Sequence, residues 1–391
     1  MTLKQIHDKY SRLPGSNFYE KSLYLSYWFL KQNLYSRWVI DCAGLRVSPR
    51  CIPPDSNNTT FDNKTIICTT GFGHTGSGAV VDLISEYDNV DVLAYIDKNG
   101  SLRKSSNKVE NGEFVLLISY GGLLDLENAF SSPSIGFRDA SLKLFLRLVA
   151  YLYTEIGGYY NNDFLTTTRD FVNNLISWKN SPGSYFFGYE YSPHLTCLGN
   201  AGEKLVFGEE KVGRIFHLKD ITVQEYRELA KTYIHNLISR ISPKSCLVLD
   251  QALSNGSVDM ERHRAYLGPF KQIACYRDPR DVYVTARMLH EVFIPNDVTE
   301  FVDFYRRSLS PYINLVNQDF LMVRFENLVN DYDKSVAEIE HFIGFTPQQH
   351  VHKKSCFDPM ISNKNIGLYK DYPDQQSIKT IESELKEFIY P

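Results

Sequence analysis

The chain has 391 residues, which is enough for one large domain or two modest ones with a sizeable hydrophobic core. Hydrophobic residues make up 43% of it and charged residues 23%, and both values are ordinary for a soluble globular protein. The formal net charge of -4 argues against a protein that coats nucleic acid, so an anion-binding site has to be built from local positive groups.

The cysteines and the apolar runs exclude further classes. Seven scattered cysteines without a CxxC pair predict reduced, mostly buried thiols in a cytoplasmic protein, and no metal-binding cluster. The first residues lack the pattern of a signal peptide. No run reaches about 18 consecutive uncharged apolar residues, so the sequence predicts no transmembrane segment.

The predicted elements begin with an N-terminal helical extension over residues 1–60, ahead of a main domain over 61–391. Within the extension, residues 17–40 have the pattern of an amphipathic helix. Thr65–Thr70 is β-branched and apolar, which predicts a strand. A glycine-rich run from Gly71 to Gly78 follows, and a helix then opens. Strand, glycine-rich loop and helix, in this order, form the setting in which backbone N–H groups bind a phosphate or sulfate.

The remaining elements alternate between apolar strands and helices. In chain order we predict a strand-like run over 113–118, mostly helix over 139–179, loops over 181–214 and a helix over 222–240. Buried strands over 245–250 and 271–276 follow, and then a helix through His290. The last predicted elements are a strand over 320–325, a helix over 331–343 that stops near Gly344, and a helix after Gln375. This alternation predicts an α/β fold with a central, mostly parallel β-sheet flanked by helices.

The glycine-rich loop supplies the first candidate anion site. Its glycines let the backbone approach an anion, and the N-terminus of the following helix adds its dipole. The nucleoside-triphosphate version of such a loop has a lysine after its second conserved glycine, where Ser77 stands here. A plain strand-to-helix turn that needs glycine is the alternative. The candidate anion-binding residues are Gly73, His74, Thr75, Gly76, Ser77 and Gly78.

A second candidate site follows the predicted strand over 271–276. Arg277 cannot lose its charge, and its fork of donors suits a phosphate. Thr285 adds a hydroxyl eight residues later, while Pro279 shapes the turn and Asp281 is expected to cap the helix. By itself this segment could be a salt-bridged turn. Together, the two segments predict a ligand that is phosphorylated at both ends of a nucleoside.

These two segments resemble the sulfotransferases that use 3′-phosphoadenosine-5′-phosphosulfate (PAPS). In that family, a strand leads into a PKSGTT-like or RSGSS-like loop around the 5′-phosphosulfate, and Gly73–Gly78 stands in this place. The family's second motif, on the 3′-phosphate, is an Arg with a Pro two residues later and a Ser eight residues later. Arg277, Pro279 and Thr285 match that spacing. The resemblance covers roughly residues 65–160 and 240–370.

The C-terminal region carries a third similarity. Asn365–Lys370 is similar to the family's Gly-x-x-Gly-Asp-Trp-Lys-type segment. Ser362, Asn363 and Lys364 stand where many members carry Arg-Lys-Gly to the 3′-phosphate. The resemblance therefore implies that Lys364 contacts the nucleotide.

One position departs from the family pattern. Most members carry Lys or Arg where His74 stands, and that cation stabilises the bridging oxygen as the sulfuryl group leaves. The resemblance implies this role for His74, either as an imidazolium or as a neutral N–H donor. Alternatively, His74 faces solvent and another cation has taken the role, with Arg103, Lys104 and Lys108 as candidates.

The acceptor hydroxyl must lose its proton as it attacks sulfur, so a base is expected. Glu113 is the first candidate, since carbohydrate sulfotransferases have a base Glu in a similar place after their first loop. His194 is the second, by analogy with small-molecule members. Asp250 and Gln251 end a predicted strand, and we expect them to contact the acceptor because ligands bind at the carboxyl ends of parallel strands.

The resemblance implies a sulfotransferase fold of the P-loop NTPase-like type. It also implies an enzyme that needs no metal, transfers a sulfuryl group from PAPS to an alcohol and releases adenosine 3′,5′-bisphosphate. A glycan hydroxyl is the default acceptor, while a sterol or other lipid alcohol would suit the 26 Tyr and 24 Phe. Two other functions remain open: an ATP-dependent P-loop phosphotransferase, and a non-catalytic nucleotide-binding protein derived from the fold.

Overall fold

The computed structural model describes part of the chain in detail. The described residues are 64–93, 108–109, 117–118, 122–132, 141–149 without 143 and 147, 162–179, 216–241, 244–251, 257–291, 293–313, 315 and 317–391. The chain divides into two compact units, one made of Met1–Cys51 with Ser134–Lys219 and the other of Ile52–Pro133 with Asp220–Pro391. The predicted helical extension over 1–60 lies outside the described residues and stays a prediction.

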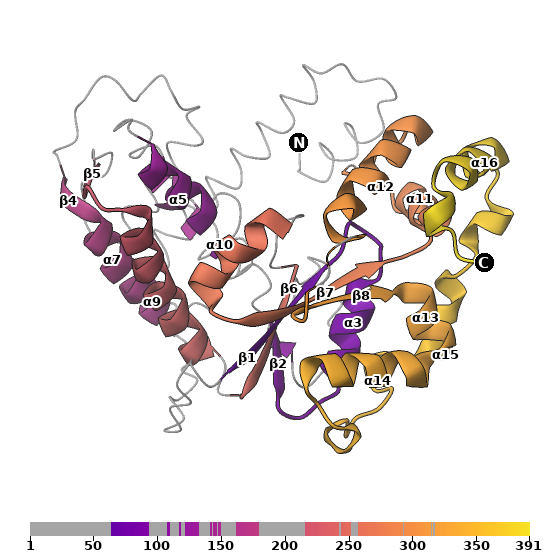
Figure 1. Cartoon of the computed structure of the whole chain (residues 1–391), viewed down its shortest axis with the longest axis horizontal. Helices are drawn as coiled ribbons and strands as arrows, with labels where there is room; N and C mark the ends of the chain where they lie inside the picture. Colours follow the sequence, from indigo (N-terminus) through magenta and orange to yellow (C-terminus); the bar gives the residue numbers. More distant parts are fainter. Residues whose placement is uncertain are drawn as a thin grey trace, which may run out of the picture. The chain divides into compact units, whose positions relative to one another are not determined.

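The second unit is built on a parallel sheet with the strand order β3-β2-β6-β1-β7-β8 (Figure 1). Every pair of neighbouring strands in it runs parallel. The strands are β1 (Thr65–Thr70), β2 (Val90–Leu93), β3 (Lys108–Val109), β6 (Cys246–Asp250), β7 (Phe270–Tyr276) and β8 (Phe320–Arg324). The predicted α/β fold with a mostly parallel central sheet is therefore confirmed for this unit.

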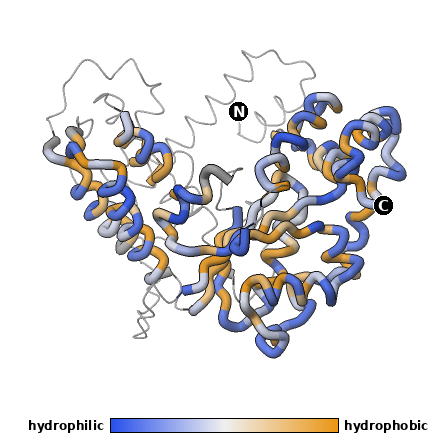
Figure 2. The backbone as a smooth tube through the Cα atoms, viewed as in Figure 1, coloured by the Kyte–Doolittle hydropathy of each residue, from blue (hydrophilic) through white to orange (hydrophobic). Residues whose placement is uncertain are grey.

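Helices pack on both faces of this sheet, as buried parallel strands require. The helices of this unit are α3 (Ser77–Ile84), α5 (Leu123–Ser131), α9 (Val223–Ile241), α10 (Ser257–Leu267), α11 (Pro279–Met288), α12 (Val298–Ile313), α13 (Phe325–Asn330), α14 (Tyr332–Ile343), α15 (Pro359–Ser362) and α16 (Gln375–Glu384). Two consecutive residues of β7 enter different buried clusters. Ile273 packs with residues of α3 and α14, whereas Ala274 packs with residues of α11, α12 and α16. Because neighbouring strand residues point to opposite faces, the two clusters lie on opposite sides of the sheet. Figure 2 shows the hydrophobic residues along the central strands.

The register of the central strands fixes where the loops after them lie. Thr69 pairs with Asp250 of β6, and Thr70 pairs with Ala274 of β7. The carboxyl ends of β1, β6 and β7 are therefore neighbours, which places the glycine-rich loop between Gln251 and Arg277. This edge of a parallel sheet is where such folds bind ligands.

The described part of the first unit consists of α7 (Asn162–Leu175) and a small antiparallel sheet of β4 (Ile176–Lys179) and β5 (Phe216–Leu218), together with helical residues between 141 and 149. The expectation of helix over 139–179 is wrong for its last four residues, because Ile176 and Trp178 pair with β5 and β-branched and aromatic side chains suit a strand. In the second unit, Leu117 and Ile118 are helical and buried, although we predicted a strand over 113–118. Periodicity cannot separate a short buried helix from a buried strand.

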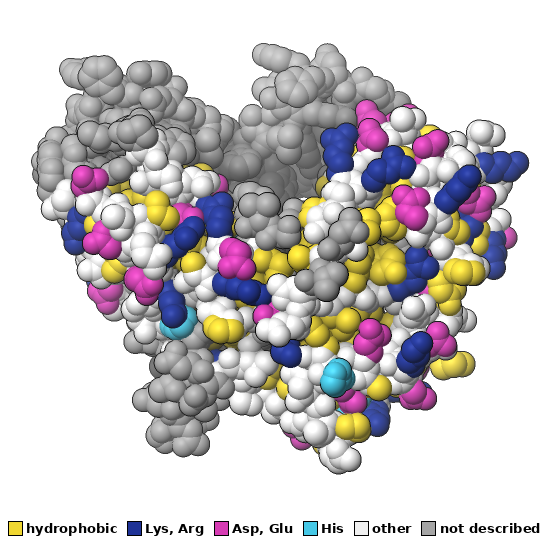
Figure 3. Space-filling view, viewed as in Figure 1, with side chains coloured by type: hydrophobic (Ala, Val, Ile, Leu, Met, Phe, Trp, Pro, Cys, Tyr) yellow, Lys and Arg dark blue, Asp and Glu magenta, His cyan; other side chains and the backbone are white. Residues whose placement is uncertain are grey.

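The other predicted elements that lie within the described residues agree with the structure to within a few residues. They are β1, α3, α9, β6, β7, α11, β8, α14 and α16. The helices α5, α10 and α12 were not predicted. In the part of the chain that is described, no helix combines the length and the hydropathy needed to cross a bilayer. On the face drawn in Figure 3, Lys and Arg side chains are interspersed with Asp and Glu side chains, as the small net charge suggests.

Candidate functional site

The glycine-rich loop between β1 and α3 has an unusual backbone. Gly73 (φ 80°), His74 (φ 54°) and Gly76 (φ 95°) all lie in the left-handed region. A Cβ atom on Gly76 would lie 2.6 Å from Cδ2 of Phe325, so this position excludes any side chain. A Cβ atom on Gly73 would lie 2.5 Å from Cε2 of Phe293. The glycines are therefore required by two aromatic rings that pack directly on the loop.

The loop leaves a row of backbone donors open. Its own hydrogen bonds join the N–H of Phe72 to Thr75 Oγ1 at 3.0 Å and the N–H of Ala79 to the carbonyl of Gly76 at 3.0 Å. The backbone N–H groups of residues 73–77 have no partner among the described residues. They precede and open α3, so its dipole adds to their partial positive charge. Such a row of N–H groups at a helix N-terminus suits a phosphate or sulfate group even without a lysine, and binding here stays a prediction.

Gln251 holds the loop from the side of β6. Its Oε1 accepts from the N–H of Gly71 at 3.3 Å, and its Nε2 donates to Ser77 Oγ at 2.6 Å. The neighbouring Asp250 accepts from Thr69 Oγ1 at 2.9 Å. Both residues lie at the predicted edge of the sheet, and their proposed contacts with an acceptor stay a prediction.

Arg277 brings the two predicted segments together. It lies 203 residues after His74 in the sequence, yet its Nη1 donates to the His74 carbonyl at 3.1 Å and to Thr285 Oγ1 at 3.2 Å. Its Nη2 donates to the carbonyl of Asn365. The side chain is only 5% exposed and lies over the ring of Phe325, and its Nε has no partner. The predicted pairing of Arg277 with Thr285 is therefore present, and it contacts the glycine-rich loop.

The predicted cap of α11 needs a correction. Asp278, not Asp281, caps this helix, since its Oδ1 accepts from the N–H two residues later at 2.9 Å. A proline at the first helical position sets the cap one residue before it. Asp281 instead accepts from the N–H groups of Gly367 and Tyr369, at 2.8 and 3.2 Å. Burial raises the pKa of Asp281, while these bonds and Arg277 act in the opposite direction. Asp281 thus ties the C-terminal segment to the second motif.

The C-terminal segment carries the predicted nucleotide contact. Lys364 lies in a short 3-10 helix, Asn363–Asn365, and is exposed. Within the described part of the chain its ammonium group has no hydrogen bond or ion pair. The next residue, Asn365, is held by Arg277. Lys364 is therefore anchored beside the candidate site with its charge available for an anion.

His74 is paired with a carboxylate that the sequence did not predict. Its Nε2 lies 3.2 Å from Oε1 of Glu291, and its ring stacks on Phe293 with 6.4 Å between ring centres. Burial lowers the pKa of His74; Glu291 opposes this shift and Arg277 adds to it. Burial therefore favours the neutral imidazole. The 21% exposure of the side chain and its contact with Glu291 disagree with a loop histidine that simply faces solvent.

Several predicted residues cannot be placed. The candidate bases Glu113 and His194, and the alternative cations Arg103 and Lys104, lie outside the described residues, as does the side chain of Lys108. The described residues hold no group of three or more side chains suited to a metal ion.

Sequence reasoning missed the contacts that surround the loop, because they come from segments with no motif. Glu291 and Phe293 follow α11 directly, and Phe325 and Glu326 follow β8. Glu326 is fully buried; its Oε1 accepts from the N–H of Asp278 at 2.7 Å, its Oε2 has no partner, and burial raises its pKa. The only signal in the sequence for these residues is that they follow closely after α11 or β8, two elements that meet the carboxyl edge of the sheet.

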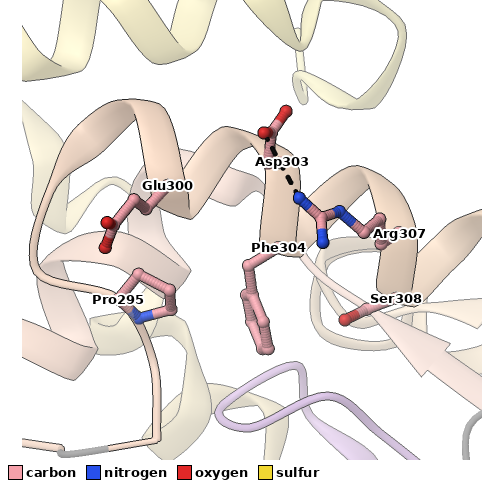
Figure 4. Close-up of a pocket in the computed structure, with 6 residues that line it drawn as sticks. All are labelled: Pro295, Glu300, Asp303, Phe304, Arg307 and Ser308. Carbon is pink, nitrogen blue, oxygen red and sulfur yellow. Dashed lines mark hydrogen bonds and ion pairs between the residues drawn. The ribbon is translucent and has the colours of Figure 1, made fainter.

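A cavity of about 500 Å³ opens on α12 (Figure 4). It is lined by Pro295, Glu300, Asp303, Phe304, Arg307 and Ser308. Arg307 forms an ion pair with Asp303 at 3.4 Å. The same helix packs on the glycine-rich loop, because the ring centres of Tyr312 and Phe72 are 5.5 Å apart. The cavity thus combines charged side chains with apolar ones, and it lies on a helix that contacts the candidate site.

Comparisons with known proteins give distant matches only. No family model and no curated protein matches the sequence. Among solved structures, the sulfotransferase domain of an olefin synthase from Synechococcus PCC 7002 matches with 12% identity and a TM-score of 0.37, covering 86% of this chain and 98% of that one.

Two further structures match at a similar level. A sulfotransferase domain from the curacin biosynthetic pathway has 12% identity and a TM-score of 0.36, over 84% of this chain and 99% of that one. A sulfotransferase from Mycobacterium avium has 12% identity and a TM-score of 0.34, over 83% of this chain and 76% of that one. Similarity at this level does not by itself establish a family or an activity.

Proposed function

We propose that this protein is a sulfotransferase that moves a sulfuryl group from PAPS to an acceptor hydroxyl and releases adenosine 3′,5′-bisphosphate. The observation that carries the proposal is the contact of Arg277 with both Thr285 and the glycine-rich loop. It joins two anion-binding groups at one edge of the sheet. A donor with phosphate groups at both ends of a nucleoside needs this pairing, whereas ATP does not.

The residues present fit such a donor. The open N–H groups of residues 73–77 suit the 5′-phosphosulfate. The Thr285 hydroxyl and the exposed ammonium of Lys364 suit the 3′-phosphate, and the buried guanidinium of Arg277 beside Thr285 adds positive charge. Ser77 stands where the triphosphate-binding loop has its lysine, which disfavours an ATP-dependent phosphotransferase.

The reaction is an in-line displacement at sulfur. A bond forms from the acceptor oxygen to sulfur as the bond from sulfur to the bridging oxygen breaks. The leaving phosphate takes the electron pair. Preorganised N–H donors stabilise the charge that develops there, so the reaction needs no metal ion.

The exposed charged side chains of this cavity favour a polyhydroxylated acceptor such as a glycan. Glu300, Asp303 and Arg307 can bond several hydroxyl groups, and Phe304 offers an aromatic face. A sterol would bury these charged groups with one hydroxyl to satisfy them, which is costly. Glycan and sterol acceptors can be compared directly by incubating the protein with PAPS and each compound, then measuring product masses.

Calorimetry with adenosine 3′,5′-bisphosphate and AMP tests the donor. We expect the bisphosphate to bind at least tenfold tighter, since a charge-assisted contact contributes about 1.5–3 kcal/mol. Arg277→Ala should remove the preference. Arg307→Ala, which removes an arginine whose side chain is 80% exposed, should keep it. Equal affinity of the wild-type protein for the two nucleotides would contradict the proposal, and ATP hydrolysis would favour the phosphotransferase instead.

A further inference from the structure

His74 is held in a conformation that is costly for a residue with a side chain. The left-handed region costs an L-residue about 1–2 kcal/mol, and such residues concentrate at functional sites. Its carbonyl accepts from Arg277, and its ring stacks on Phe293. Both the backbone and the ring of His74 are therefore fixed, which a residue that only connects β1 to α3 does not need.

The two ring nitrogens have different surroundings. Nε2 is buried and lies 3.2 Å from Oε1 of Glu291, within ion-pair distance but without the geometry of a hydrogen bond. Nδ1 has no hydrogen-bond partner among the described residues, and the side chain keeps 21% exposure. A carboxylate beside Nε2 favours the tautomer with its proton on that nitrogen, which leaves the lone pair on Nδ1. A neutral imidazole in this tautomer can accept a proton.

Burial of the ring opposes the cation that the family resemblance implies. It is the largest influence on the pKa of His74 and lowers it, and Arg277, after β7, lowers it as well. Glu291, after α11, raises this pKa, but burial outweighs it, so the neutral imidazole is favoured. The open N–H groups of residues 73–77 and Arg277 already supply positive charge at the loop.

We propose that His74 is the general base of the reaction and that Glu291 is the positioning residue that orients it. This inference rests on the proposed function. The proton of the acceptor hydroxyl passes to Nδ1 while the acceptor oxygen forms its bond to sulfur. The bond from sulfur to the bridging oxygen breaks, and its electron pair stays on the 5′-phosphate of the leaving nucleotide. Glu291 stabilises the imidazolium that forms, as the carboxylate does in a Ser-His-Asp triad.

The tautomer can be measured without any turnover. In a ¹⁵N NMR spectrum of the histidine rings of the full chain, the resonances absent from His74→Ala belong to His74. At pH 7 we expect the neutral form with its proton on Nε2, and a change of this pattern in Glu291→Gln. The exposed control Glu338→Gln should leave it unchanged. An imidazolium at pH 7, or a proton on Nδ1, would overturn the proposal.

Turnover separates a base from a leaving-group cation by the sign of its pH dependence. With PAPS alone, water is the acceptor, and release of adenosine 3′,5′-bisphosphate reports the rate. A base is active when neutral, so the rate should rise as pH rises through the pKa of His74, whereas a cation would give a falling rate. His74→Ala should lower kcat by about 10²–10⁴ with bisphosphate affinity unchanged. Added imidazole should restore part of the rate.

Three variants sharpen this result. His74→Lys should stay inactive, while full activity would return His74 to the leaving-group role. Glu291→Gln should lose less than His74→Ala, and the exposed control His341→Ala should lose nothing. If His74→Ala keeps the wild-type rate and Glu113→Gln is inactive, the base is Glu113. If the wild-type protein prefers the bisphosphate to AMP but His74→Ala stays active, only this inference is contradicted. If the wild-type protein binds AMP as tightly as the bisphosphate, the proposed function itself is contradicted.

Discussion

The two ends of α3 use hydrogen bonds in opposite ways. At its N-terminal end, the backbone N–H groups of residues 73–77 have no partner within the described residues. Just beyond its C-terminal end, the fully buried Glu86 accepts from the N–H groups of Lys354, Cys356 and Phe357 and contacts Nε2 of His350 at 2.5 Å. One end keeps donors for a ligand, and the other leaves no acceptor unused.

The contacts of Glu86, just beyond the C-terminal end of α3, help to position residues at the N-terminal end of this helix. Glu86 fixes residues 350–357, and the chain then continues through α15 to Lys364 and Asn365. Asn365 contacts Arg277, which contacts the glycine-rich loop. A buried carboxylate that accepts several hydrogen bonds holds the segment around it in place. The comparison shows that the hydrogen bonds beyond the C-terminal end of α3 help to position the C-terminal segment of the chain near the N-terminal end of this helix.

The largest effect should come from Glu86→Ala. It leaves the buried His350 and three backbone N–H groups without their acceptor, and removing one partner of such a buried pair costs about 3–5 kcal/mol. Urea unfolding measures this loss. The matched control is Asp88→Ala, which removes a carboxylate from an ion pair with His352 that is about half exposed, and should cost about 0–1 kcal/mol. Equal losses would contradict the contrast between the buried and the exposed pair.

A smaller effect is expected for Gly76→Ala at the open end. Its positive φ costs an alanine about 1–2 kcal/mol, and the new Cβ would also meet the ring of Phe325. Gly344→Ala, after α14, shares the positive φ but meets nothing within 4 Å. Both variants should lower the melting temperature, Gly76→Ala by more. Only Gly76→Ala should weaken binding of adenosine 3′,5′-bisphosphate, and a loss of affinity in both variants would refute a local role for the loop.

The smallest effect is expected for Gln251→Ala. It removes the amide that holds Ser77 Oγ and the N–H of Gly71, at a cost of about 0.5–1.5 kcal/mol. Bisphosphate affinity, measured by calorimetry, should fall by roughly two- to tenfold. Gln349→Ala, in an exposed capping box, is the control and should bind normally. Unchanged bisphosphate affinity with a higher KM for the acceptor would make Gln251 an acceptor contact instead.

The sequence predicted much of the fold because its main elements carry local patterns. Thr65–Thr70 forms β1 with the predicted bounds, and α14 ends at Gly344 as predicted. Patterns failed where two structures suit the same residues. Residues 117–118 are helical and residues 176–179 form a strand, because the packing partner decides the conformation of a short apolar run.

The candidate site divides in the same way. The glycine-rich loop and the Arg277 segment are visible in the sequence, because an anion site needs glycine, a helix N-terminus and a fixed cation within a few residues. The local sequence does not reveal which side chains surround these two segments. Only the order of the parallel strands brings Gln251 and Arg277 to the loop, and only the fold sets Glu291 beside His74 and Asp281 beside Gly367. Local chemistry predicted the candidate anion-binding segments. Contacts between residues distant in sequence, fixed by the packing of the whole sheet, decided the partners of these segments and the surroundings of His74.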